Sequence, residues 1–104
     1  MEEYISIRPQ VLSLIEKALP EIKERFGVET LGLFGSVSRG EDTPESDIDI
    51  IFTFQKGRTS FGNLIHLELY LKELLGREID LIPEDAVSRY MLPEISREVI
   101  RIAS

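Results

Sequence analysis

Two carboxylates, Asp47 and Asp49, stand two residues apart near the middle of the chain, and the Gly35-Ser36 pair precedes them. In an extended strand alternate side chains lie on one face, so both acids point in the same direction. Two such acids repel each other unless a cation lies between them. Because magnesium takes one or two carboxylates together with phosphate oxygens, the spacing predicts a Mg²⁺ site beside a bound phosphate group.

The Gly-Ser pair predicts where that phosphate binds. Gly35 permits close approach to the backbone, and the amides around Ser36 begin a helical turn whose dipole favours anions. Taken alone, a Gly-Ser pair after a strand is usually a turn, and an isolated Asp-x-Asp triplet is usually a solvated strand edge. The two together, with apolar Ile48 and Ile50 between and after the acids, favour a nucleotide-binding site.

Two further charged residues are candidates for the same site. Asp80, in the string EIDLI, is the third acid that a two-metal phosphoryl transfer needs for its second ion. Arg39 has two interpretations: it contacts phosphate or a neighbouring acid, or it pairs with Glu41 or Asp42. Both interpretations stay open at the level of sequence.

The elements that position these residues follow from apolar periodicity. Residues 8–26 carry an apolar stripe at spacings of three and four, which predicts a helix. Pro20 favours a kink in that helix, and Gly27 ends it. Buried strands are expected over residues 30–34 and 46–54, with Ser46 capping or orienting the start of the second.

A second helix and a third strand complete the predicted core. The helix is expected over residues 61–75, capped by Thr59 or Ser60, with a mostly buried face that includes Ile65. The strand spans residues 78–82. A helix between two strands permits a parallel crossover, which can bring Asp80 near the other two acids.

The remaining segments are expected to be helical or solvated. A short helical turn is predicted over residues 84–88, and a last helix begins at Pro93 and carries Ile95, Val99 and Ile102. Lys56, Arg58 and Arg77 are interpreted as solvated loop charges, with substrate or partner contact as the alternative, and His66 as a surface residue. The fold class is α/β (α+β): one domain over residues 1–104 with a small mixed sheet of three or four strands flanked by helices.

Composition restricts the function. The net charge of -7 argues against duplex DNA or RNA as substrate, since such binding depends on lysine and arginine. It allows a free nucleoside triphosphate, because a divalent ion supplies the missing positive charge. With no cysteine, no signal segment and no apolar run long enough to span a membrane, the expectation is a cytoplasmic protein without membrane partners.

The spacing of these residues resembles the minimal nucleotidyltransferase family, a branch of the DNA polymerase beta-like nucleotidyltransferase superfamily. The resemblance covers the chain from about Leu31 to Asp80 and implies the polymerase beta-like fold. It also implies nucleotide contacts from Gly35, Ser36 and Arg39, and a catalytic metal site formed by Asp47, Asp49 and Asp80. Ser38 stands where many relatives carry alanine, which leaves the metal site unaffected. The pattern as a whole comprises Gly35, Ser36, Arg39, Gly40, Ser46, Asp47, Asp49 and the later Asp80.

The resemblance further implies a setting. Relatives act as antitoxins of HEPN-family ribonuclease toxins, and they transfer AMP from ATP onto a toxin tyrosine. The leading hypothesis is therefore a magnesium-dependent protein adenylyltransferase, with a homo- or hetero-oligomeric state left open. One alternative is a binding module that neutralises its toxin by occlusion without catalysis. Another is nucleotidyl transfer to a small molecule, although the familiar enzymes of that type carry an additional domain.

Overall fold

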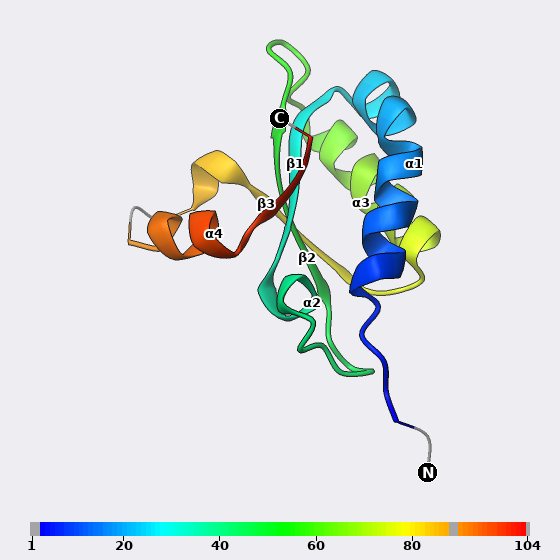
Figure 1. The fold of residues 1–104 in the computed structure, drawn as a ribbon. Coiled ribbons are helices and arrows are strands. Elements are labelled where there is room, and N and C mark those ends of the chain that lie inside the picture. The colour runs from blue at the N-terminus through cyan, green and yellow to red at the C-terminus, as the bar shows by residue number, and fades with distance from the viewer. Residues whose placement is uncertain (1–2, 88–89, 104) are drawn as a thin grey trace.

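The chain folds around a four-stranded mixed sheet with helices on both of its faces (Figure 1). The computed structural model describes residues 3–87 and 90–103. In chain order the elements are α1 (Arg8–Phe26), β1 (Val28–Phe34), α2 (Gly35–Arg39), β2 (Ile48–Phe54), α3 (Phe61–Leu75), β3 (Ile79–Pro83), the 3₁₀ turn η1 (Glu84–Ala86), α4 (Leu92–Glu98) and β4 (Ile100–Ala103).

The strand order β3-β2-β1-β4 combines parallel and antiparallel pairing. β1 pairs antiparallel with both β2 and β4, whereas β2 and β3 are parallel. The parallel crossover through α3 that the sequence predicted is therefore confirmed. Since a parallel pair needs a connection longer than a hairpin turn, α3 both joins these strands and covers the sheet.

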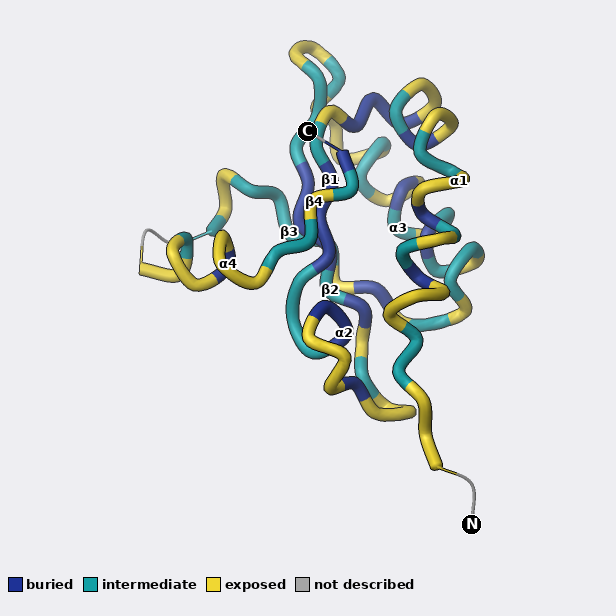
Figure 2. The backbone as a smooth tube through the Cα atoms, in the orientation of Figure 1, coloured by how far each residue is buried: buried dark blue, intermediate teal, exposed yellow. Residues whose placement is uncertain are grey.

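The core lies between the sheet and the pair α1 and α3. Figure 2 shows buried positions concentrated along β1, β2 and the helix sides that face them. α1 has the predicted bounds and continues through Pro20, and Gly27 ends it in the left-handed conformation (φ 71°). Within the described residues, no helix is both long and apolar enough to cross a bilayer. The fully buried side chains include Ile15, Ile22, Leu31, Leu33, Ile48, Ile50, Phe52, Leu67 and Leu71.

α3 has its predicted bounds, but its apolar residues are divided between two sides. Leu67 and Leu71 are fully buried, whereas Phe61, Ile65 and Leu69 are 77%, 39% and 58% exposed. The expectation that Ile65 belongs to the buried face is wrong. Because helical residues four apart share a side, the three exposed residues form an apolar stripe opposite the core.

The end of the chain departs from the predicted last helix. α4 ends at Glu98, and residues 100–103 form β4, which adds a fourth strand beside β1. Val99 is therefore at the helix C-cap and Ile102 is in a strand, where β-branched residues are favoured. The turn predicted over residues 84–88 is a 3₁₀ turn over Glu84–Ala86, and Ser88 lies outside the described residues.

Ser60 is the N-cap of α3, which resolves the choice between the two hydroxyls. Its side chain accepts a hydrogen bond from the Asn63 amide at 3.0 Å. We expect Ser60→Ala to lower the free energy of unfolding by about 1 kcal/mol, since one helix amide loses its partner. Thr59→Ala is the matched control and should change stability by less than about 0.5 kcal/mol. Urea unfolding monitored by circular dichroism measures both, and equal losses would contradict the assignment.

Candidate active site

The antiparallel register of β1 and β2 places the Gly-Ser turn beside the carboxylates. Phe34, the last residue of β1, pairs with Asp49 of β2. Gly35 follows directly with a positive φ of 77°, and the chain then enters α2. A methyl group at Gly35 would overlap Asp49 Oδ2 and lie 3.0 Å from Asp49 Cγ. The glycine is therefore required both by its backbone angle and by the carboxylate packed against it.

The parallel register of β2 and β3 brings the third acid to the same place. Asp49 and Asp80 are direct partners across the two strands. Asp47 lies just before β2, and both it and Asp80 are exposed, whereas Asp49 is half-buried. The structure thus brings Asp49, Asp80 and the Gly-Ser turn together, with Asp47 near the edge of the group.

The electrostatics of this cluster centre on Asp49, whose pKa is raised from 3.8 to about 6. Burial is the largest cause of the raised pKa, and the negative charges of Asp80 and Asp47 act in the same direction, while the Arg39 guanidinium opposes them. A hydrogen bond with Asp80 also favours the protonated acid. An ionised Asp49 is therefore held among like charges, which is the environment that a divalent cation relieves.

The donor atoms of this cluster fit a hard cation, although they are not a complete protein cage. Among residues 3–87 and 90–103, no three acidic, histidine or cysteine side chains are grouped so as to hold an ion by themselves. Magnesium needs only one or two carboxylates when phosphate oxygens and water supply the other ligands. Asp49, with Asp80 or Asp47, matches that requirement in ligand chemistry.

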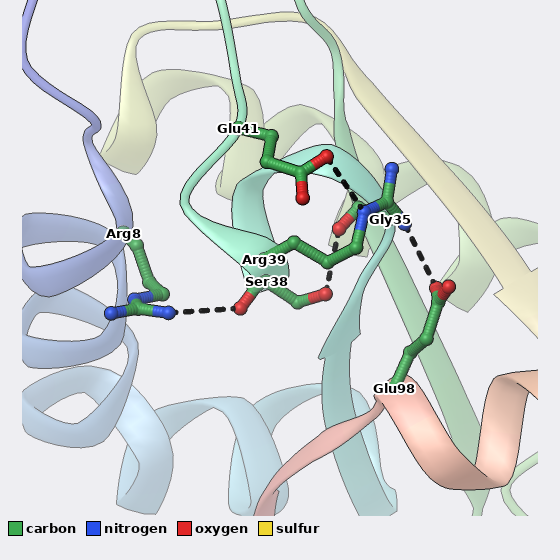
Figure 3. Close-up of polar contacts among 6 residues, drawn as sticks. All are labelled: Arg8, Gly35, Ser38, Arg39, Glu41 and Glu98. Atoms are coloured by element: carbon green, nitrogen blue, oxygen red, sulfur yellow. Dashed lines mark hydrogen bonds and ion pairs between the residues drawn. The ribbon is translucent and has the colours of Figure 1, made fainter.

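Hydrogen bonds within α2 shape the Gly-Ser turn (Figure 3). The buried Ser38 hydroxyl donates to the Gly35 carbonyl at 2.6 Å, and Arg8 Nη1 donates to the Ser38 carbonyl at 3.2 Å. Ser36 is half-buried, and its hydroxyl has no hydrogen bond with any described residue. It is therefore available as a donor to a ligand.

Arg39 pairs with two acids across the same region. Its side chain reaches Glu41 at 3.4 Å and Glu98, at the end of α4, at 3.0 Å (Figure 3). The prediction that it pairs with Glu41 is confirmed, and Glu98 is a partner that sequence spacing did not indicate. The positive charge of Arg39 also acts to lower the pKa of Asp49, against the larger effects of burial and of the neighbouring acids.

Sequence reasoning missed two residues that hold the loop between α2 and β2. Asp42 is buried, with 6% of its surface exposed, and Arg77 is half-buried against the same loop, so Arg77 is not the solvated loop charge that was predicted. Their partners are 31 to 73 residues away in sequence. Neither residue carried a spacing signal, because each stands in a polar stretch where acids and arginines are commonly exposed.

A cavity of about 440 Å³ lies elsewhere on the sheet, and none of the three acids lines it. It is bordered by the far ends of β2 and β3 and the start of α3 (Phe54, Phe61, Leu64, Pro83 and Asp85). Its lining is mostly apolar, without the grouped carboxylates of the other end of β2. The cavity is therefore separate from the carboxylate cluster.

The raised pKa of Asp49 predicts a pH-dependent stability. Between pH 3.8 and about 6 the folded state keeps a proton that the unfolded chain releases, so a rise in pH destabilises the fold, and above pH 6 the penalty is complete. Two pKa units correspond to about 3 kcal/mol, which solvent screening reduces to about 1–2 kcal/mol. We expect metal-free Asp49→Asn to exceed wild type in stability by that amount at pH 7.5 and by clearly less at pH 4.5. Urea unfolding at both pH values measures this, and a pH-independent difference would contradict it.

Comparisons with known proteins agree with this arrangement. Residues 15–103 match the model of a family described as "Nucleotidyltransferase domain". The protein adenylyltransferase MntA of Thermococcus cleftensis is 36% identical over 93 residues, which are 89% of this chain and 93% of that protein. A solved structure of a minimal nucleotidyltransferase superposes with a TM-score of 0.75 at 32% identity, covering 88% of this chain and 92% of that one.

Two more distant structures share the fold. A toxin-antitoxin complex with AMP-PNP gives a TM-score of 0.68 at 20% identity and covers 86% of this chain and 73% of that one. A complex of a tri-AMPylated HEPN toxin of Shewanella oneidensis with its MNT antitoxin gives 0.62 at 18% identity, with coverages of 89% and 73%. At these identities the likeness concerns the fold alone. The mixed sheet flanked by helices is therefore that of the minimal nucleotidyltransferases.

Proposed function

This chain belongs to the nucleotidyltransferase domain family and is a nucleotidyltransferase enzyme, and from that premise we propose that it transfers AMP from ATP to a hydroxyl of a partner protein. The observation that carries the proposal is the register that makes Asp49 a direct neighbour of both Asp80 and the Gly35 turn. In this proposal the turn binds phosphate and the neighbouring acids bind a cation, so that both lie within one cluster.

The residues have distinct proposed roles. Gly35 lets the triphosphate approach the backbone, and the unpaired Ser36 hydroxyl donates to a phosphate oxygen. Asp47 and Asp49 hold Mg²⁺ with the triphosphate, and Asp80 completes the metal site. When bound, Mg²⁺ neutralises the phosphate charge and supports attack by the acceptor oxygen. Arg39, whose positive charge acts on Asp49 against the neighbouring acids, is proposed to contact a phosphate group.

The proposed acceptor is a tyrosine of a HEPN-family toxin. Support comes from two similar proteins: MntA is a protein adenylyltransferase, and a neighbour by fold is the antitoxin of an AMPylated HEPN toxin. Asp47 and Asp80 are exposed, so a side chain of a macromolecular acceptor can reach them. The net charge of -7 favours a basic partner.

Mass spectrometry of the genomic neighbour tests the proposal. We expect the neighbouring protein, incubated with this chain, ATP and Mg²⁺, to gain the mass of AMP on a tyrosine. Asp47→Asn should give no gain, while Asp85→Asn, the same change on the exposed turn η1, should match wild type. No gain with wild type, or an equal gain with Asp47→Asn, would refute transfer.

Two related measurements test the alternative functions. If Asp49→Ala and Asp80→Ala still protect cells from the toxin, neutralisation proceeds by occlusion rather than by modification. If labelled AMP appears on small molecules of a cell extract and not on protein, the acceptor class is different. Loss of protection by folded variants would count against the occlusion model.

A further inference from the structure

The N-terminal segment, residues 3–7, is tied to the loop that connects the Gly-Ser turn to the acids. Its anchor is Asp42, which is buried with 6% of its surface exposed. The Tyr4 hydroxyl donates to Asp42 Oδ2 at 2.6 Å, the Ile7 amide donates to the same oxygen at 3.1 Å, and the Ser6 hydroxyl donates to Oδ1. Burial raises the pKa of Asp42, but these hydrogen bonds outweigh that effect and lower it overall. The carboxylate is therefore ionised at neutral pH and fully used as an acceptor.

Arg77 holds the other side of the same loop. Its Nη1 donates to the carbonyls of Thr43 and Ser46 at 2.9 and 3.1 Å. Its Nη2 donates to the Tyr4 hydroxyl at 2.8 Å, and the guanidinium lies 5.8 Å from the centre of the Tyr4 ring. Tyr4 thus bridges Arg77 to Asp42. The Arg77 guanidinium thus donates hydrogen bonds to three oxygen atoms, and we call this group of contacts the clamp.

The place of these contacts in the chain connects them to the acids. Ser46 is the residue before Asp47, and Arg77 lies two residues before β3, the strand that carries Asp80. Beside them the Ile48 amide donates to the Glu78 carbonyl at 3.0 Å, at the point where β2 and β3 meet. Arg77 therefore joins the segments that lead into both acid-bearing strands.

We propose that Asp42 and Arg77, bridged by Tyr4, are positioning residues for the nucleotidyltransferase site. They fix the loop at residues 41–46 and the start of β3, so that Asp49 and Asp80 are aligned before any ligand binds. Arg8 extends the same support to α2 through the Ser38 carbonyl. None of these side chains touches the reacting atoms. The expected effect on catalysis rests on the proposed function, whereas the expected effect on the position of the loop and of β3 does not.

The location of the contacts made by Asp42, Tyr4 and Arg77 argues against a role in overall stability alone. The apolar core lies among α1, α3 and the strands, whereas the contacts of Asp42 and Arg77 are made at the loop between α2 and β2 and at the N-terminal segment. Arg77 instead donates to two backbone carbonyls of one loop and to the Tyr4 hydroxyl of the terminal segment. Its loss should therefore loosen the junction of β2 and β3 more than it weakens the core.

The test uses Arg77→Met, with Arg25→Met as a control that removes an exposed ion pair on α1. We expect amide exchange of Ile48, measured by NMR without metal, to accelerate about tenfold in Arg77→Met, which corresponds to the loss of about one charge-assisted hydrogen bond. The Mn²⁺ dissociation constant should rise about 3- to 10-fold. In the AMP-transfer assay kcat should fall about tenfold with KM for ATP changed less than about threefold.

Tyr4→Phe keeps the proposal testable if Arg77→Met does not fold, because it removes only the bridging hydroxyl. It should accelerate Ile48 exchange and weaken Mn²⁺ binding in the same direction, by less than Arg77→Met. Arg77→Lys should reduce these effects on Ile48 exchange and Mn²⁺ binding only in part, because a single ammonium cannot span all three acceptors. If Ile48 exchange and Mn²⁺ binding in the clamp variants equal those of Arg25→Met, the positioning role is overturned. If wild type transfers no AMP, the proposed function fails, and the exchange and Mn²⁺ measurements still decide the positioning role.

Discussion

Asp49→Asn is expected to abolish AMP transfer while leaving a folded protein. Asp49 pairs with Asp80 on β3, and its carboxylate also packs against the Gly35 turn, so it lies next to both halves of the cluster. The amide keeps the shape and removes the charge that holds the proposed cation. Losing that electrostatic support costs several kcal/mol in the transition state, so we expect the rate to fall by at least about 10³-fold.

Single-turnover transfer with Mg²⁺ and the proposed partner protein measures this loss. Asp85→Asn provides the matched control, because it makes the same chemical change on an exposed acid outside the cluster. Since the neutral amide in Asp49→Asn also relieves the repulsion among the acids, this variant should be at least as stable as wild type at pH 7.5. Its loss of activity therefore cannot be attributed to unfolding. A variant that keeps more than about a tenth of the wild-type rate would contradict the role assigned to Asp49.

Gly35→Ala is expected to damage both stability and activity. Two independent penalties apply: alanine is strained at a φ of 77°, and its methyl group would overlap the Asp49 carboxylate. The backbone strain alone costs about 1 kcal/mol. Displacing the Asp49 side chain adds to it, so we expect a total loss of about 2–3 kcal/mol and a fall in transfer rate of at least about 100-fold.

Gly57→Ala separates the two penalties. Gly57 has nearly the same backbone angle, φ 82°, and no heavy atom lies within 4 Å of the added methyl group. Its replacement should cost only the backbone strain and should leave AMP transfer unchanged. Thermal unfolding and the transfer assay compare the two variants. Equal losses of stability with full activity in both would show that the methyl group at residue 35 does not disturb Asp49.

Much of the candidate site was predictable from sequence because its residues obey short-range rules. The Asp47-x-Asp49 spacing, the turn at Gly35 and the helix between two strands each follow from a local pattern. The pairing of Asp49 with Asp80 then follows from the parallel crossover. The roles of these residues toward nucleotide and metal stay predictions, because a strand register places side chains together without specifying the ligand that they bind.

The features that sequence reasoning missed depend on distant partners. Asp42 looks like one more acid of a polar loop, and only the packed N-terminal segment makes it a buried anchor. Residues 99–103 have no period that distinguishes a short strand from a helix end, and the unpaired edge of β1 decides the outcome. The exposed Ile65 on α3 shows that a helical stripe can be apolar on two sides.

The parallel pairing of β2 with β3 has a kinetic consequence. Asp49 and Asp80 are 31 residues apart in sequence, so their contact forms only after the whole of α3 has closed the intervening loop. Non-local pairings of this kind are late and slow steps of folding. A nascent chain that has emerged only as far as residue 78 contains the Gly-Ser turn and the Asp-x-Asp triplet but lacks β3. Such a chain already contains the motif that identifies the family, but it does not yet contain Asp80 and therefore lacks the complete candidate site.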